Sequence, residues 1–383
     1  MICTINSETG RHDAPDDTAH APPQISPAIA AVAPDQEGAR CDAGSDPEKK
    51  RGHAQKRAGG HYFVVCPQRL AEALRLGIKP ALAYLGLARG TRRFNLTTSW
   101  AVAAIERYGL MSRRNARAAV EKLEASGLIS PRGHLKRRIL APHLSKEKAE
   151  LLYLPNRLIG AVPGDISPLK PLSEMGEATG ASALALLMEM YRLCHLLVDH
   201  GCNPALISAR WPLKCLGEGR GAYRIYGLGQ EGTWHYDPQP SPLPIPCREA
   251  APDILNILDD LHLLRVVKYA FTYPPEREGE MLFPACCFEG EEAENAYGQA
   301  HSQAARLALE RTAKNQKEKD KLARGFWDFV AVPRHISEPL LVGLVRPRWL
   351  ADTSHSRQWL AKLREWEVFA EPGAKAIDQR WRP

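Results

Sequence analysis

Hydrophobic and polar positions follow a regular pattern from Tyr62 onward, and the pattern predicts a series of short elements. The segment FVVC is a short apolar run, and PQRLAEALRLG and KPALAYLGLARG each have helical spacing that stops at a glycine. The segment LTTSWAVAAIERYG adds a helix with Thr or Ser caps and an apolar face at Ala101, Ala104 and Ile105. The pattern therefore predicts an apolar run followed by three helices.

The stretch SRRNARAAVEKLEASGLI, residues 112–129, predicts the most informative helix of the chain. Ser112 is a good N-cap because its hydroxyl can accept hydrogen bonds from amides of the first turn. Helical spacing predicts one buried stripe of apolar residues, formed by Ala116, Val120 and Leu123. Gly127 and the apolar pair behind it predict the point where the helix ends.

Four polar residues occupy the first turn and a half of this helix: Arg113, Arg114, Asn115 and Arg117. The positive end of the helix dipole makes cations mildly unfavourable there, so helix stability does not explain them. A recognition helix enters the major groove of DNA by its N-terminal turns, where arginine can bind guanine and asparagine can pair with adenine. We therefore predict that these four residues read bases. The alternative is a solvated face on a domain that mediates protein contacts.

A cationic hairpin is predicted directly after this helix, in SPRGHLKRRIL, with Pro131 and Gly133 as its turn residues. Its basic side chains would lie along phosphates or in the minor groove. The residues predicted to contact the DNA backbone are Arg132, His134, Lys136, Arg137 and Arg138 in the hairpin, Ser112 at the helix start, and Arg92 and Arg93 before the supporting helix.

The charge of the chain is concentrated in this part. The formal net charge is +7, but residues 61–142 carry 15 Lys or Arg against 4 Asp or Glu, which is +11. The remainder of the chain is therefore net negative, at −4. A compact basic stretch of this kind indicates a polyanionic partner, and double-stranded DNA is the first expectation. A membrane surface is the weaker alternative.

The stretch LTTSWAVAAIERYGLMSRRNARAAVEKLEASGLIS, followed by PRGHLKRRIL, resembles the winged helix-turn-helix of bacterial regulators of the GntR and MarR type. The resemblance implies a winged-helix DNA-binding domain over residues 61–142, with Arg113, Arg114 and Arg117 on the exposed face of its reading helix. No recognisable effector-binding domain follows the wing, so no small-molecule effector is expected.

Residues 143–180 are punctuated by proline and glycine and are predicted to be a connector. A second winged-helix-like domain is predicted over 181–290, with a long helix at about 182–200, a second helix in PDILNILDDLH, and a strand pair that turns at PPEREG. The region 203–250 is rich in Pro, Gly, Trp and Tyr. Its segment RWPLKCLGEGRGAYRIYG mixes basic and aromatic residues, which suits a backbone contact, although a packed insertion is favoured.

The two helix-plus-hairpin units are related by an offset of 135 residues, which places Gly127 opposite His262 at the helix exit. That position typically needs positive φ, which Gly adopts freely and His tolerates better than most residues. The second unit differs in charge, because residues 251–290 carry 3 Lys or Arg against 7 Asp or Glu. Phosphate would repel such a surface. The unit is therefore predicted to support dimerisation or docking, in a homodimer or a larger nucleoprotein assembly. The matched apolar pairs are Val120 with Leu255, Leu123 with Leu258, Leu128 with Leu263 and Ile129 with Leu264; the acidic residues of the second helix are Asp253, Asp259 and Asp260.

Both ends of the chain are predicted to lie outside the winged units. Residues 1–60 are expected to be a disordered arm whose basic end, KKRGHAQKRA, is either a solvated linker or a source of nonspecific phosphate contacts. Residues 291–383 are expected to be a helical C-terminal region. The predicted fold class is α+β, mainly α with small β: tandem winged helix-turn-helix domains plus C-terminal helices and the arm. This layout resembles that of plasmid and phage replication initiators.

The composition, 44% hydrophobic and 25% charged, is typical of a soluble protein. The most apolar stretch, ASALALLMEMYRLCHLLV, carries Glu189, Arg192 and His195, so it is predicted to be a core helix and no membrane partner is expected. No secretory signal is visible at the N-terminus. Nine cysteines without a framework spacing predict free thiols in a bacterial cytoplasm, with the protein associated with nucleoid or plasmid.

The candidate catalytic and metal-binding patterns in the sequence are all incomplete, which favours a binding protein over an enzyme. The segment GLGQEG at 227–232 fits a dinucleotide motif by its letters, but TWHYDPQPSP after it cannot form the helix that such a site requires. Cys194, His200 and Cys202 lack the two close pairs of a zinc site. HLLR at 262–265 lacks the surrounding residues of a recombinase site. No catalytic residue, cofactor or metal is expected.

These patterns predict a sequence-specific double-stranded DNA-binding protein, either a transcriptional regulator or a plasmid- or phage-type replication initiator. It would read the major groove with the helix 112–125 and contact the backbone with the wing 130–140. The alternative is a non-catalytic assembly subunit of a mobile-element or defence nucleoprotein complex. A nuclease or recombinase with a cryptic site ranks third.

Overall fold

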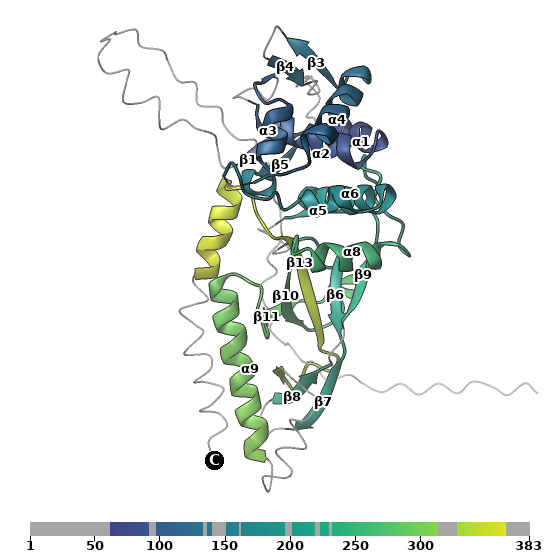
Figure 1. Ribbon diagram of the computed structural model, residues 1–383. Coiled ribbons are helices and arrows are strands. Elements are labelled where there is room, and N and C mark those ends of the chain that lie inside the picture. Colours follow the sequence, from purple (N-terminus) through teal and green to yellow (C-terminus); the bar gives the residue numbers. More distant parts are fainter. Residues whose placement is uncertain are drawn as a thin grey trace, which may run out of the picture. The chain divides into compact units, whose positions relative to one another are not determined.

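The computed structural model describes residues 62–91, 97–132, 136–139, 151–160, 162–195, 201–218, 223–229, 232–312 and 328–364. These residues all belong to one compact unit, Arg57–Pro383. The arm predicted over 1–60 lies outside the described residues. Helices and strands are interspersed along the described chain, so the fold is mixed α and β (Figure 1). The prediction of small β content is wrong, because sheets of five and three strands accompany the helices of the second half.

The first part of the described chain follows the predicted order of elements. It contains β1 (Tyr62–Val65), α1 (Pro67–Arg75), α2 (Ile78–Arg89), β2 (Thr97–Thr98), α3 (Val102–Arg107), α4 (Arg113–Ala125), β3 (Ile129–Arg132) and β4 (Lys136–Ile139). All residues of α2 except Lys79 and Arg89 are buried, and a helix that is apolar all round belongs in a core. The helix α2 contacts α1, α3 and α4. Three of these strands form an antiparallel sheet in the order β2-β4-β3.

The residues 143–180, predicted to be a connector, contribute to this core where they are described. They contain β5 (Leu152–Pro155), the short 3-10 helix η3 (Asn156–Leu158) and α5 (Lys170–Glu174), and they lead into α6 (Glu177–Leu193). The strand β5 pairs antiparallel with β1. Leu154 and Leu158 are fully buried in the hydrophobic cluster that also includes α2 and α4. The helices of this segment also pack against the first helices of the chain, since α6 contacts α1 and α5 contacts α2.

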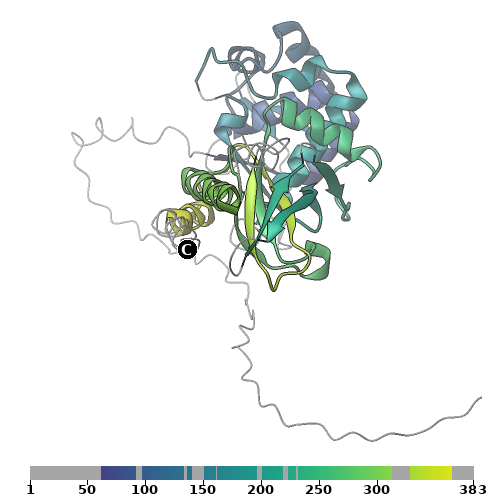
Figure 2. The same ribbon diagram turned by 90° about the horizontal axis from the view of Figure 1, so that it is seen from below.

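The second half is built on a five-stranded antiparallel sheet in the order β11-β10-β13-β6-β9. Its strands are β6 (Ile207–Trp211), β9 (Thr233–Tyr236), β10 (Leu264–Phe271), β11 (Met281–Pro284) and β13 (Leu340–Pro347), and the 3-10 helix η4 (Pro275–Arg277) connects β10 to β11. The helices α6 and α8 (Ala251–Asp260) contact each other, α6 contacts β13, and α8 contacts β9 and β10. Figure 2 shows the yellow strand β13 beside strands from much earlier in the chain.

The region 291–383 was expected to be helical, but the described part of it also supplies two strands. After α9 (Glu292–Thr312), β12 (Phe329–Pro333) joins a sheet of order β12-β8-β7 with β7 (Leu213–Glu218) and β8 (Tyr223–Leu228), and β13 joins the five-stranded sheet. A helix over residues 354–364 follows. The described residues of the basic and aromatic segment 210–227 form the end of β6, β7 and most of β8, and Ile225 is fully buried, which agrees with the packed insertion favoured from the sequence.

The two helix exits related by the 135-residue offset have the same backbone geometry. After α4, Gly127 has φ +76, and the N–H of Leu128 donates to the carbonyl of Leu123 at 3.1 Å. After α8, His262 has φ +53, and the N–H of Leu263 donates to the carbonyl of Leu258 at 2.9 Å. A residue of positive φ followed by this bond is a common way to end a helix. The positive φ predicted for His262 is therefore confirmed.

A buried ion pair joins α9 to the five-stranded sheet. Glu294 on α9 accepts two hydrogen bonds from the guanidinium of Arg346 on β13, at 2.7 and 2.8 Å, and one from the hydroxyl of Tyr269 on β10. The guanidinium also lies 4.6 Å from the ring centre of Trp359, in the helix over 354–364. These bonds satisfy charges that would otherwise be costly to bury. Among the described helices, none has the length and apolarity needed to cross a membrane.

Candidate nucleic-acid interface

The helix α4 is fixed by its cap and its buried stripe. Ser112 is extended, and its hydroxyl accepts a hydrogen bond from the backbone N–H of Asn115 at 3.5 Å, the long end of the range for such a bond. Ala116, Val120 and Leu123 are at most 2% exposed and pack in the main hydrophobic cluster. The helix contacts α2, α3 and β3. Burial of one face therefore fixes which face α4 presents to solvent.

The predicted base-reading residues lie on that outer surface. Ser112, Arg113, Arg114 and Arg117 are exposed, and Asn115 is half-buried. Within the described residues, no carboxylate forms an ion pair with any of the three arginines. The cluster thus stands at the positive end of a helix dipole without a compensating acid. An external anion would stabilise this arrangement.

The hairpin after α4 places further cations on one strand. The strand β4 is central in its sheet, where Arg138 is opposite both Thr97 and Ser130, and Lys136 is opposite Arg132. The structure therefore brings Lys136, Arg137 and Arg138 into the sheet that borders α4. The predicted contacts Arg92, Arg93 and His134 and the turn residue Gly133 lie outside the described residues.

Sequence reasoning did not identify Arg89, at the end of α2. Its guanidinium lies 4.2 Å from the ring centre of Tyr108 and 5.0 Å from that of Trp100, and the two rings are stacked 4.5 Å apart. Its Nε and Nη1 atoms are buried and have no hydrogen-bond partner among the described residues. No local sequence pattern indicates this arrangement, because Arg89 ends α2, Trp100 precedes α3 and Tyr108 follows α3.

The equivalent surface of the second unit has the opposite charge, as the sequence predicts. On α8, Asp253 and Asp260 are exposed and Asp259 is half-buried. Burial raises the pKa of Asp259, and the neighbouring charges of Glu289 and Asp260 raise it further. An acidic helix face of this kind does not attract phosphate.

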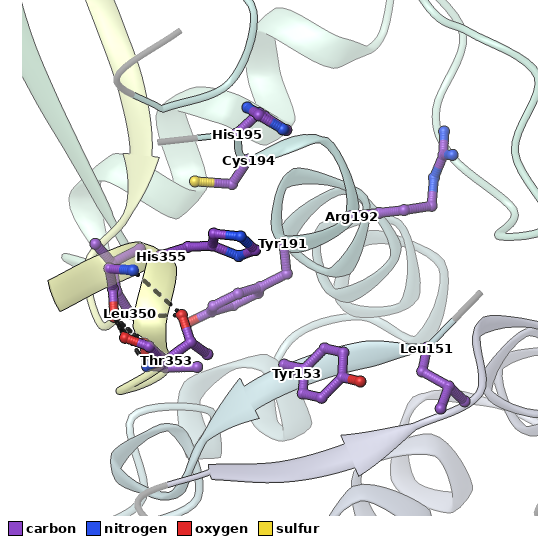
Figure 3. A pocket seen from close by; sticks show the side chains of 11 residues that line it. Leu151, Tyr153, Tyr191, Arg192, Cys194, His195, Leu350, Thr353 and His355 are labelled. Carbon is purple, nitrogen blue, oxygen red and sulfur yellow. Dashed lines mark hydrogen bonds between the residues drawn. The ribbon is translucent and has the colours of Figure 1, made fainter. Parts of the chain in front are cut away.

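A separate pocket of about 260 Å³ lies between the end of α6, β5 and the segment 350–356 (Figure 3). It is lined by Tyr191, Cys194, His195 and His355, among others. The hydroxyl of Tyr191 donates to the backbone carbonyl of Trp349 at 2.7 Å, so it is engaged in the fold. Burial raises the pKa of Tyr191 well above its usual range. In the part of the chain that the structure describes, no group of three or more His, Cys, Asp and Glu side chains is placed to hold a metal ion.

The described geometry therefore includes a cationic surface at the first turns of α4, followed by a hairpin whose strand β4 carries three basic residues in sequence, and a separate mixed pocket. No protein-family model matches the chain, and no curated protein or solved structure matches it significantly.

Proposed function

We propose that the chain is a sequence-specific double-stranded DNA-binding protein that reads the major groove with α4 and contacts the backbone with the β3–β4 hairpin. The observation that carries the proposal is a set of exposed arginines, Arg113, Arg114 and Arg117, on the first turns of a helix whose opposite face is buried. None of them has an ion pair with a described residue. Arginines in this position can each make two hydrogen bonds to a guanine edge.

The order of elements around α4 supports a winged helix-turn-helix. The elements α2, β2, α3, α4, β3 and β4 follow one another, and the sheet order β2-β4-β3 places the last strand between the other two. In such a domain the second helix of the pair enters the major groove and the hairpin lies along the backbone. Here those roles fall to α4 and to the hairpin with Arg132, Lys136, Arg137 and Arg138.

The second half supports a second winged-helix-like unit, which is interrupted by insertions and has no counterpart of α3 among the described residues. Its elements are α6, β6, α8, β10 and β13, and its central strands have the order β6-β13-β10, which matches β2-β4-β3. The strands β7 to β9 are inserted before α8, and β11, α9 and β12 are inserted before β13. The shared helix exit at Gly127 and His262 agrees with this correspondence. The proposed unit therefore extends beyond residue 290, to β13.

Two winged units in one chain suit a plasmid- or phage-type replication initiator, and a transcriptional regulator is the other role for such a protein. The acidic face of α8 favours a protein contact for the second unit, either in a homodimer or in a larger nucleoprotein assembly. That face also supports the alternative function, a non-catalytic assembly subunit. The two candidates differ in whether α4 selects a DNA sequence.

The deciding experiment is selection of bound fragments from random duplex DNA, followed by titration of the preferred site with variants. We expect Arg113→Ala and Arg117→Ala each to weaken binding to that site by about 1–3 kcal/mol and to flatten the base preference. Lys122→Ala, which removes an exposed cation from the later turns of the same helix, is the matched control and should keep the preference. Unchanged selectivity in both arginine variants would favour the assembly subunit.

A further inference from the structure

A groove of about 980 Å³ lies where the first half of the described chain meets the second, and four arginines line it. Arg89 comes from the end of α2, Arg157 from η3, Arg265 from β10, and Arg348 follows β13. Glu291 and Asp352 are the carboxylates among the lining residues. The lining therefore carries a net positive charge, contributed by four segments far apart in the sequence.

Three of these arginines, Arg89, Arg157 and Arg348, have no ion pair within the described residues. Arg265 is neutralised by Glu291 at 2.6 Å, and Asp352 lies 3.3 Å from Arg357. Arg157 is exposed and Arg348 is half-buried, and no carboxylate described in the structure pairs with either of them. Unpaired guanidinium groups that face one groove from different elements repel each other, and a bound anion would offset that repulsion.

Arg89 adds an independent observation. Its guanidinium contacts the stacked rings of Trp100 and Tyr108, while its buried Nε and Nη1 atoms have no hydrogen-bond acceptor in the part of the chain that the structure describes. Buried polar groups in proteins nearly always have such a partner, and a buried charge without one is costly. A phosphate in the groove would offset the charge of Arg89. Because Trp100 and Tyr108 stack on each other and both contact Arg89, the two rings are already engaged within the fold.

Backbone pairing connects a wall of the groove to the hairpin. Thr91, which lines the groove beside Arg89, forms a backbone bridge with Thr98 of β2. Thr98 is in turn opposite Arg137 of β4. One antiparallel sheet thus leads from the hairpin proposed to follow the DNA backbone to the wall of the groove.

We propose that this groove, the arginine groove, binds the sugar-phosphate backbone of duplex DNA beyond the site that α4 reads. The inference rests on the proposed function and deepens it. Four arginines from separate segments suit a polymer of phosphates better than one small anion, and the engagement of Trp100 and Tyr108 with each other and with Arg89 favours contact with the backbone over the bases. The arginine groove would therefore raise affinity for all sequences and lengthen the protected DNA without changing base preference.

The test compares the full chain with Arg157→Ala, Arg348→Ala and the double variant, on DNA that carries the preferred site with long flanks. We expect each single change to reduce the slope of log affinity against log salt by about 1, because each removes a phosphate contact. The double variant should also give a shorter footprint with the same preferred sequence. Arg277→Ala, at an exposed position on η4, is the control and should change neither quantity.

A second pair of variants separates charge from structure. Arg157→Lys and Arg348→Lys retain the charge and should keep the salt slope of the original protein. If the double alanine variant keeps both the salt slope and the footprint while α4 still selects its site, the arginine groove does not bind DNA and the proposed function stands. If the original protein selects no sequence in any salt, the proposed function fails. If no sequence is selected but the double alanine variant has a smaller salt slope than the original protein, the arginine groove still binds DNA, as a nonspecific contact.

Discussion

The carboxylate of Glu177, in the first turn of α6, accepts a hydrogen bond from the backbone N–H of Ile78, the first residue of α2, at 2.5 Å. The acid thereby satisfies a free amide at the positive end of a helix from the other half of the fold. Gly77, the residue before α2, has φ +123, and a Cβ there would collide with the Glu177 carboxylate. The contact thus needs both a glycine and an acid at positions 100 residues apart.

Replacing Glu177 with Ala should lower the free energy of unfolding by about 1 kcal/mol, because one amide loses its charged acceptor. Gly77→Ala should cost more, since it adds backbone strain to the collision. The measurement is the midpoint of urea unfolding at a constant m-value. Glu174→Ala removes an exposed carboxylate whose ion pair within the described residues is with Lys170, and it should change the stability by less than about 0.5 kcal/mol. Equal effects of Glu177→Ala and Glu174→Ala would contradict this account.

The Glu294–Arg346 pair should be the most sensitive polar contact of the second half. Glu294→Gln leaves the Arg346 charge buried without its counter-ion, so we expect a loss of about 3–5 kcal/mol of stability. Replacing both residues with apolar ones, as in E294L with R346M, should cost less than the single change, because no charge remains buried. Glu292→Gln, at an exposed position on the same helix, is the control. Calorimetric or denaturant unfolding of the variants tests the order.

Parts of this fold follow from local sequence, and α4 is the clearest case. Its cap at Ser112, its buried stripe and its glycine exit all lie within one stretch, so the helix and its exposed arginines could be predicted. The positive φ of His262 could also be predicted, because the offset of 135 residues places it opposite Gly127 at a helix exit. The strand β13 could not be assigned, because it completes a sheet whose other strands come up to 140 residues earlier in the chain. The same holds for the arginine groove, where Arg89 and Arg348 come together only through the tertiary fold.

The stability of the protein should fall in mild acid because of His301. This side chain is buried on α9, its Nε2 accepts a hydrogen bond from the backbone N–H of Ala331, and burial lowers its pKa from 6.5 to about 4. Between these two values the unfolded chain binds a proton that the folded chain does not, so stability decreases as the pH falls from 6.5 towards 4. The full effect corresponds to about 3 kcal/mol.

His301→Gln should remove the part of the stability loss that occurs between pH 6.5 and 4, measured by urea unfolding at a series of pH values. His335→Gln replaces an exposed histidine and should leave the loss in place. The contribution of Glu294 falls in a lower window. Burial opposes its ionisation, but the charge and hydrogen bonds of Arg346 outweigh burial and hold its pKa below 4.5, so its contribution is lost only as the pH falls through that lower value. An unchanged pH profile in His301→Gln would mean that another group controls the acid transition.

The hairpin and the helix should contribute to DNA binding in different ways, and Lys136 separates them. Lys136 lies at the start of β4, opposite Arg132, in the strand proposed to follow the backbone. Phosphate contacts carry no base information, so Lys136→Ala should weaken binding to all duplexes by the same factor and reduce the salt slope by about 1. Arg113→Ala should instead weaken the preferred site more than the others. Titrations of both variants on the preferred site and on a scrambled duplex, at several salt concentrations, measure the difference. If Lys136→Ala changed the ranking of sequences, the hairpin would read bases and the division of roles between α4 and β4 would have to be reversed.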